Sequence, residues 1–154
     1  MRLHRIDAEP SPIVRHACEQ DVVVAQTVQA NLDLYARKGF VPPWVGYLAE
    51  RDERFVGSCG FAGPPVNGEA EIAYFTFPGN EGKGIATEMA KTLIREVRLG
   101  MDSHALVAHT LPEEGASPAI LRKLGFKCLG VIAHPEDGSV WKWRYQVPRP
   151  RREA

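Results

Sequence analysis

Apolar and polar residues alternate along this chain with two periodicities, one typical of strands and the other of amphipathic helices. Apolar residues at helical spacing predict three helices, over residues 18–38, 82–99 and 117–125, with Gly39 and Gly100 ending the first two. Short apolar or alternating runs predict strands over residues 44–50, 54–62, 68–77, 104–110, 126–133 and 139–147. The segment 134–138, between the last two strands, has the composition of a turn.

The order of these elements predicts the fold class. Several antiparallel strands precede a strand–helix–strand–helix–strand section, which indicates an α/β (α+β) fold with one mixed, mostly antiparallel sheet flanked by helices. The 154 residues, 44% of them hydrophobic, suit a single domain with its own core. We expect this domain to span residues 13–147, between a loose N-terminal leader (1–12) and a flexible basic tail (148–154), because both ends are polar and contain prolines.

Charge and cysteine content narrow the function classes. Nineteen basic residues balance nineteen acidic ones, so we expect neither a nucleic-acid partner nor a basic membrane-binding surface. No apolar run is long enough for a signal peptide or a membrane span. The three cysteines are odd in number and far apart, which favours a reducing cytoplasm. Neither they nor the five scattered histidines have metal-ligand spacing, so we expect no metal.

The entry to the predicted helix at 82–99 is unusual, because EGKG (81–84) offers no Ser, Thr, Asp or Asn to cap it. The first N–H groups of a helix lack internal partners, and together with the helix dipole they favour an anion. Glycines let a ligand approach the backbone, although a plain glycine-rich turn is the alternative. The stretch fits neither the P-loop pattern nor the dinucleotide-binding pattern.

What this stretch resembles is the acetyl-CoA site of GNAT-type N-acetyltransferases, Gln/Arg-x-x-Gly-x-Gly/Ala at the start of a helix. Gly84 and Ala86 match the pattern. Glu81 stands where Gln or Arg is usual, and we expect its carboxylate to point away from the pyrophosphate or to pair with Lys83. Three further segments resemble the family in the same order, and the last two resemble its RimJ/RimL-like branch. They are EAEIAYFTF (69–77), AHTLPEEGASPAILRKLGF (108–126) and VWKWRYQV (140–147).

The resemblance covers nearly the whole chain and implies an acetyl-CoA-dependent N-acetyltransferase. Such an enzyme transfers the acetyl group directly to a primary amine in a ternary complex, with acetyl-CoA as co-substrate. The acceptor would be a protein N-terminus or a small-molecule amine. The alternative is a CoA-binding sensor or scaffold module that has lost catalysis. The sequence leaves a homodimer open.

The resemblance also implies the cofactor contacts, which are Phe75, Thr76, Phe77, Gly82, Lys83, Gly84, Ile85, Ala86, Thr87 and Glu114. The backbone of residues 75–77 is expected to pair with the pantetheine arm, while the side chains there belong to the core. Glu114 occupies a position where the family has Asn, and a carboxylate cannot donate as that amide does.

The chemistry requires a base, because a thioester is attacked by an unprotonated amine. A lysine amine, with a pKa of about 10.4, is almost entirely protonated at neutral pH. Strand alternation places Glu69 and Glu71 on one face of the predicted strand. Glu71 matches the family's catalytic glutamate and Glu69 is the second candidate. A solvated or ion-paired strand residue is the alternative for either.

The leaving thiolate requires an acid. Many members of the family use a tyrosine as the acid at the position that Leu121 occupies here. This chain therefore cannot use the tyrosine mechanism. The serine of the RimL-like pattern corresponds to Ser117, for which helix capping ahead of Pro118 is the alternative role.

Three further residues are candidates for contact with the acceptor. Trp44 and Tyr47 lie where the family builds its acceptor pocket, with core packing as the alternative. His109 ends a strand that points toward the cofactor, and is a candidate substrate contact or second base, with an ordinary strand-end histidine as the alternative.

Overall fold

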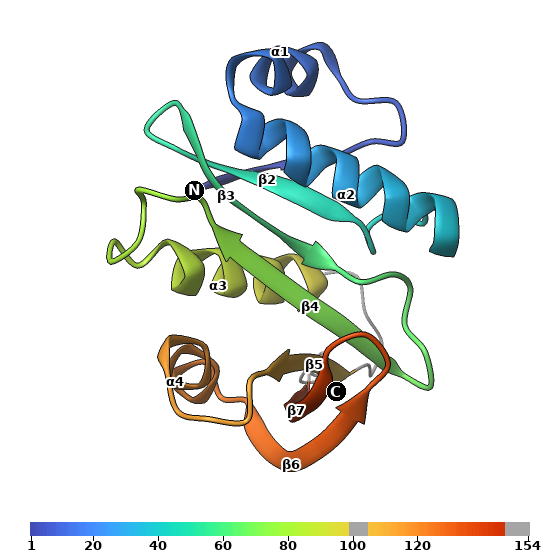
Figure 1. Ribbon diagram of the computed structural model, residues 1–154, viewed down its shortest axis with the longest axis vertical. Coiled ribbons are helices and arrows are strands. Elements are labelled where there is room, and N and C mark those ends of the chain that lie inside the picture. The colour runs from blue at the N-terminus through green and yellow to red at the C-terminus, as the bar shows by residue number, and fades with distance from the viewer. Residues whose placement is uncertain (99–104, 147–154) are drawn as a thin grey trace, which may run out of the picture.

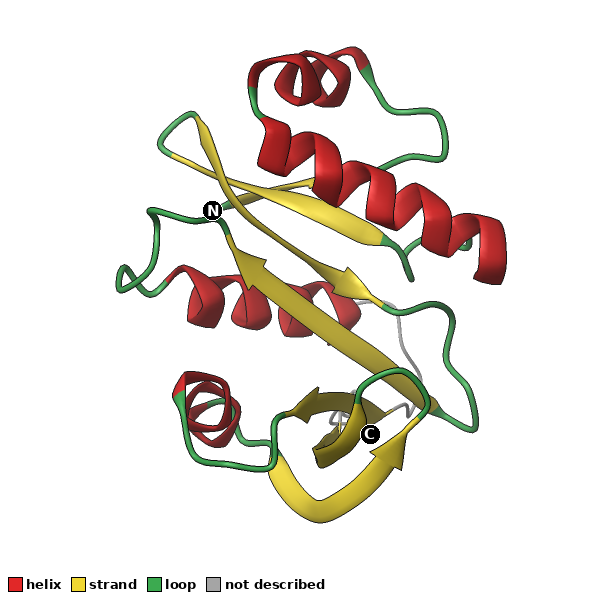
Figure 2. Ribbon diagram, viewed as in Figure 1, coloured by secondary structure: helices red, strands yellow, loops and turns green. Residues whose placement is uncertain are grey.

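One seven-stranded sheet organises the part of the chain that the computed structural model describes, residues 1–98 and 105–146 (Figures 1 and 2). The strands lie in the order β1-β2-β3-β4-β5-β7-β6. Only the β4–β5 pair is parallel among these neighbours. The elements are β1 (Arg2–Arg5), α1 (Pro12–Gln20), α2 (Val22–Lys38), β2 (Gly46–Arg51), β3 (Arg54–Phe61), β4 (Glu69–Thr76), α3 (Ile85–Arg98), β5 (Ala105–Thr110), α4 (Ala116–Lys123), β6 (Lys127–His134) and β7 (Gly138–Gln146).

The sheet divides in its middle, between β4 and β5. These strands pair only from Glu69, opposite Ala105, to Glu71, opposite Val107. Beyond Glu71, β4 continues along β3 and β5 continues along β7, and the two strands separate (Figure 1). Glu71 therefore lies at the apex of the split.

Helices cover both faces of the sheet. The core beneath α3 and α4 is built from side chains such as Ile72, Met89 and Leu121. A second core lies beneath α1 and α2, where Val28 packs near Leu48. This arrangement confirms the predicted α/β fold, with a mixed and mostly antiparallel sheet flanked by helices.

The alternation predicted for β4 is also confirmed. Ala70 and Ile72 are buried in the core with α3, whereas Glu69 and Glu71 are only half-buried and line a cavity together with Lys38 of α2. The strand thus presents its carboxylates to the α2 side of the sheet.

The prediction of one helix over 18–38 is wrong, because two helices occupy this region. Asp21 lies between them in an extended conformation, with φ −143° and ψ 119°. Its carboxylate accepts a hydrogen bond from the N–H of Val23 at 2.8 Å and so caps α2. The first helix begins earlier than expected, at Pro12, with Ser11 as its cap.

The expected loose leader is likewise wrong for residues Arg2–Arg5, which form the edge strand β1 along β2. The segment RLHR lacks an apolar alternation, and charged residues are common on edge strands. The remaining limits of the domain stay predictions. The predicted helix end at residues 99–100, the strand start at 104, Val147 and the tail 148–154 lie outside the described residues.

Candidate active site

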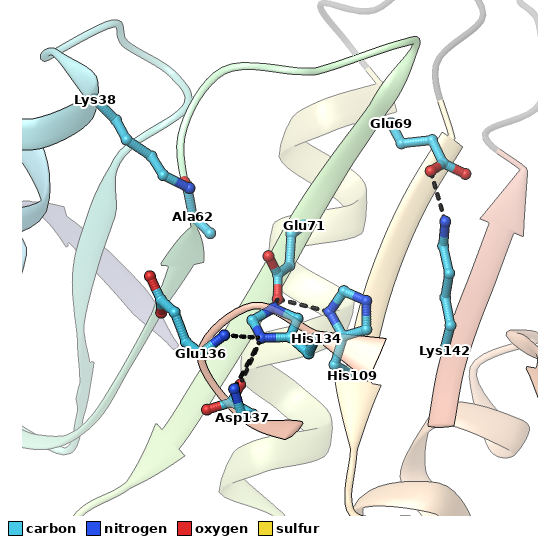
Figure 3. Close-up of polar contacts among 9 residues, drawn as sticks. All are labelled: Lys38, Ala62, Glu69, Glu71, His109, His134, Glu136, Asp137 and Lys142. Atoms are coloured by element: carbon cyan, nitrogen blue, oxygen red, sulfur yellow. Dashed lines mark hydrogen bonds and ion pairs between the residues drawn. The ribbon is translucent and has the colours of Figure 1, made fainter. Parts of the chain in front are cut away.

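Glu71 lies beside two histidines from other strands (Figure 3). Its Oε1 atom is 2.7 Å from Nδ1 of His109 on β5 and 3.6 Å from Nε2 of His134 at the end of β6. The side chains of His109 and His134 are 12% and 13% exposed, so both rings are largely shielded from water. The first contact is a hydrogen bond, and the second is too long to be one.

A tight turn orients His134. The backbone N–H groups of Glu136 and Asp137 both donate to its Nδ1, each at 3.2 Å. A neutral ring that accepts at Nδ1 carries its proton on Nε2, which faces Glu71. Sequence reasoning missed His134, because it opens a segment whose composition indicates only a turn. Its proximity to Glu71 depends on strand order.

Glu69, the second candidate base, is held by two cations of β7. Its carboxylate accepts from Nζ of Lys142 at 2.8 Å and from Nε of Arg144 at 3.2 Å. The hydrogen bond from Lys142 is the main reason that the pKa of Glu69 lies below its usual value. A carboxylate stabilised in this way is a weak base.

A cavity of about 560 Å³ opens beside Glu71 on the α2 side of the sheet. Glu69, Glu71, His109 and Lys142 line one wall, and the loop 62–67 together with Lys38 lines the other. Nζ of Lys38 donates to the backbone oxygen of Ala62 at 3.0 Å, which holds this lysine at the cavity (Figure 3). The predicted acceptor residue His109 is therefore placed at a site with room for a ligand.

A separate cleft of about 310 Å³ lies at the start of α3. Predicted cofactor residues form most of its wall, namely Thr76, Gly82, Gly84, Ile85, Ala86 and Thr87, and Ala116 and Ile120 of α4 complete it with Asn80 and Glu81. Gly82 and Gly84 have φ values of +76° and +73°, which favour glycine. No atom lies within 4 Å of a Cβ built on either. The helix begins at Ile85, later than predicted.

Arg51, Glu88 and Glu81, near this cleft, each have a hydrogen-bond partner. Arg51 of β2 donates to the backbone oxygen of Lys83 at 3.0 Å and pairs with the carboxylate of Glu88, whose pKa is lowered chiefly by that hydrogen bond. Glu81 accepts from the N–H of Gly79 at 2.8 Å, so its carboxylate is engaged by its own loop. Arg51 could not be predicted from the sequence, because its contact with Glu88 joins two elements, β2 and α3.

Four predicted cofactor residues do not line the cleft. Phe77 is 3% exposed and belongs to the core, as expected, but Phe75 is 49% exposed, so the expectation that its side chain is in the core is wrong. Lys83 contributes its carbonyl to Arg51. Glu114 forms a two-point pair with Arg122, at 2.5 and 2.7 Å, which lowers the pKa of Glu114.

Ser117 does not cap α4, so the alternative role considered for it is wrong. The N-cap position is Gly115, and no side chain caps the helix there. Ser117 instead forms a hydrogen bond with the hydroxyl of Tyr74, which lies on β4 across the split. Burial raises the pKa of Tyr74, and this effect outweighs the lowering by Ser117. Alternation along β4 places Tyr74 on the face opposite Glu71, a signal that sequence reasoning did not use.

Trp44 and Tyr47 are partly buried and pack against the core. The Trp44 ring packs edge-on against Phe61 with centroids 5.0 Å apart. The Tyr47 hydroxyl donates to the backbone oxygen of Pro43 at 2.8 Å, and burial raises the pKa of Tyr47 to about 12. Neither residue lines the cavity beside Glu71.

The described chain thus combines a split sheet, a carboxylate at the apex of the split and a glycine-rich helix start. The family model described as the acetyltransferase (GNAT) domain matches residues 2–127. The chain therefore belongs to the GNAT acetyltransferase family, which confirms the resemblance and the expected enzyme class.

Solved structures of RimL proteins have a similar fold. Apo RimL, a ribosomal L7/L12 α-N-protein acetyltransferase, is 20% identical with a TM-score of 0.68, covering 94% of this chain and 92% of that one. A RimL complex with coenzyme A is 23% identical with a TM-score of 0.63, covering 80% and 71%. An acetyltransferase from Salmonella typhimurium that modifies the N-terminal serine of L7/L12 is 20% identical with a TM-score of 0.66, covering 95% and 94%.

At these identities the likeness to the solved structures concerns the fold. A comparison with curated proteins gives no significant match. Among the described residues, none of the helices combines the length and apolar character needed to cross a bilayer.

The ion pairs of Glu69 make stability depend on pH. Glu69→Gln should lower the free energy of unfolding at pH 7 by about 1 kcal/mol, the scale of a partly exposed pair. Because the pKa of Glu69 is lowered in the folded state, its stabilisation is present above the usual value of 4.5 and is lost as the pH falls through the lowered pKa. Urea unfolding of both proteins between pH 7 and pH 3.5 or so measures this. A difference that stays constant with pH would contradict the assignment.

Proposed function

We propose that this chain transfers the acetyl group of acetyl-CoA to a primary amine, with the cofactor and the amine entering from opposite faces of the split sheet. One observation carries the proposal: Glu71 lies at the apex of the split and lines the 560 Å³ cavity on one face, while the glycine cleft opens on the other face. The two ligands would meet beside Glu71.

The cofactor would lie along the free edge of β4. The N–H groups at the start of α3 and the open faces of Gly82 and Gly84 suit the pyrophosphate, since a helix N-terminus favours an anion. Beyond Glu71, no ladder joins β4 to β5 in the described residues, so the backbone groups of residues 72–76 that face away from β3 can pair with the pantetheine amides. The carboxylate of Glu81 accepts a hydrogen bond from its own loop, and that of Glu114 is paired with Arg122.

Glu71 is the proposed base. The Nδ1–H of a neutral His109 donates to Oε1 of Glu71, which leaves Oε2 to accept the proton of the amine, directly or through water. The nitrogen then attacks the thioester carbonyl, the N–C bond forms, and the C–S bond breaks. His109 orients the carboxylate in this scheme. Glu69 is held by Lys142 and Arg144 and serves to shape the cavity.

Ser117 is the proposed acid. Its hydroxyl passes a proton to the developing thiolate as the C–S bond breaks, and it regains a proton from water. Tyr74 positions this hydroxyl through their hydrogen bond, and because burial raises the pKa of Tyr74, Tyr74 keeps its own proton at neutral pH.

An N-terminal α-amine is the first acceptor to test. The structural neighbours named above modify the N-termini of ribosomal proteins. An α-amine, with a pKa of about 7.7–8.0, is also easier to deprotonate than a lysine amine near 10.4. A small-molecule amine is the other acceptor class that the 560 Å³ cavity admits.

Replacing the proposed base should separate catalysis from binding. Glu71→Gln should lower kcat for acetyl transfer by roughly 10²–10⁴-fold, the contribution typical of a positioned base. Glu69→Gln is the matched control on the same face of β4 and should lower kcat far less. Thermal shifts with acetyl-CoA should stay equal in all three proteins.

Two results would overturn this role. Equal losses of kcat in both variants would remove Glu71 as the base. A wild-type protein that binds acetyl-CoA but acetylates no amine would favour the sensor or scaffold module.

Gly84→Asp tests the cofactor site. A ligand at about 100 times its dissociation constant stabilises a protein by about 2.7 kcal/mol, which raises the melting temperature measurably. Acetyl-CoA and CoA should produce this shift in the wild type and none in Gly84→Asp, where a carboxylate would face the pyrophosphate. Gly68→Asp is the matched control, with φ +75° and equally open space outside the cleft. An unchanged shift in Gly84→Asp would place CoA elsewhere.

A further inference from the structure

Two histidines far apart in the sequence meet at Glu71 because β5 and the end of β6 converge there. One potential ligand atom from each of Glu71, His109 and His134 lies within 4.8 Å of the other two. The expectation of no metal rested on the wide spacing of the histidines in the sequence. The fold brings two of them together. We propose that these three residues bind one divalent transition-metal ion of the zinc class.

The donor set suits this class of ion. Zinc takes imidazole nitrogen and carboxylate oxygen at about 2.0–2.2 Å, which places neighbouring donors about 3–3.5 Å apart. The separations of Glu71 Oε1 from His109 Nδ1 and from His134 Nε2, 2.7 and 3.6 Å, lie on either side of that range. Small side-chain rotations would bring all three donors to one ion. Magnesium and calcium prefer sets made only of oxygen, so they fit the site poorly.

His134 would coordinate through Nε2, the nitrogen that faces Glu71. That mode requires the proton on Nδ1, and the Oδ2 atom of Asp137 lies 3.3 Å from Nδ1 and can accept it (Figure 3). A carboxylate behind a ligating histidine is a frequent partner in zinc sites. The N–H groups of Glu136 and Asp137 favour the other tautomer of His134, and Nδ1 of His109 carries a proton when it donates to Glu71, so metal binding moves the ring proton to the other nitrogen in both histidines.

The site is accessible to an ion and to a further ligand. Glu71 and His109 line the 560 Å³ cavity, so coordination positions not taken by protein face that space. An ion bound there takes the carboxylate lone pairs that would receive the proton of the amine. Zinc should therefore inhibit acetyl transfer. The inhibition rests on the proposed function, whereas metal binding stands independently of it.

Direct metal titration of chelator-treated protein tests the proposal. The background is Cys128→Ser, because the exposed Cys128 thiol would itself bind zinc. Calorimetry with Zn²⁺ should give one ion per chain, and Co²⁺ should give visible absorption bands of a site with nitrogen and oxygen ligands. Mg²⁺ should give neither signal.

His134→Gln should weaken Zn²⁺ binding by roughly 10–100-fold or more, since even residues behind the ligands contribute on this scale. Zinc should also no longer inhibit the acetyl transfer that this variant retains. His4→Gln is the matched control, because His4 pairs with a single carboxylate, Glu50, at 3.1 Å. Its zinc affinity should equal that of the background protein. Acetyl-CoA thermal shifts report that each variant is folded and binds the cofactor.

The outcomes separate the two proposals. Absence of Zn²⁺ binding, or binding that His134→Gln and His4→Gln leave equally strong, overturns the metal site whatever the activity. If zinc binding depends on His134 but the metal-free protein acetylates no amine, the metal site is supported and the proposed function is rejected.

Discussion

The parallel pairing of β4 with β5, which ends at Glu71, is the constraint on which the remaining structure depends. Beyond Glu71, β4 stays paired with β3 and β5 stays paired with β7, while the two halves of the sheet separate. A sheet cannot leave backbone groups unpaired in a dry interior at low free energy. A ligand with amide groups can therefore pair with the strand edges at the split, and Glu71 lies at the apex of the split.

Charge pairing distinguishes that carboxylate from its neighbours. Glu69, Glu88 and Glu114 each face lysine or arginine, and each has a lowered pKa as a result. Glu71 instead contacts His109 and lies near His134. Imidazoles exchange protons and bind transition metals near neutral pH, which guanidinium groups do not. The same geometry therefore underlies both the proposed proton transfer and the proposed metal site.

The elements that can be predicted from the sequence are those whose own residues show a local pattern, such as apolar–polar alternation or a run of glycines. Period-two alternation placed Glu69 and Glu71 together on one face of β4, and the glycines of 82–84 marked an open helix start. Edge strand β1 was missed, because its polar residues are stabilised by pairing with β2 rather than by an apolar face. The apolar pattern predicts one continuous helix through Asp21, since a single cap residue hardly changes the apolar period around it.

The site was predictable only in part for the same reason. Glu71 and the glycine loop lie within segments that the pattern assigns, whereas His134 and the Tyr74–Ser117 contact arise where distant segments meet. Strand order β5-β7-β6 brings His134 to the apex, and no local spacing encodes that order.

Hydrogen–deuterium exchange with and without acetyl-CoA tests most directly whether the split sheet holds the cofactor. The account predicts slower exchange in peptides that cover residues 72–76 and 79–87, because the cofactor would pair with or cover these amides, and no change in β2. Unchanged exchange in both segments, in a protein that binds acetyl-CoA, would contradict it.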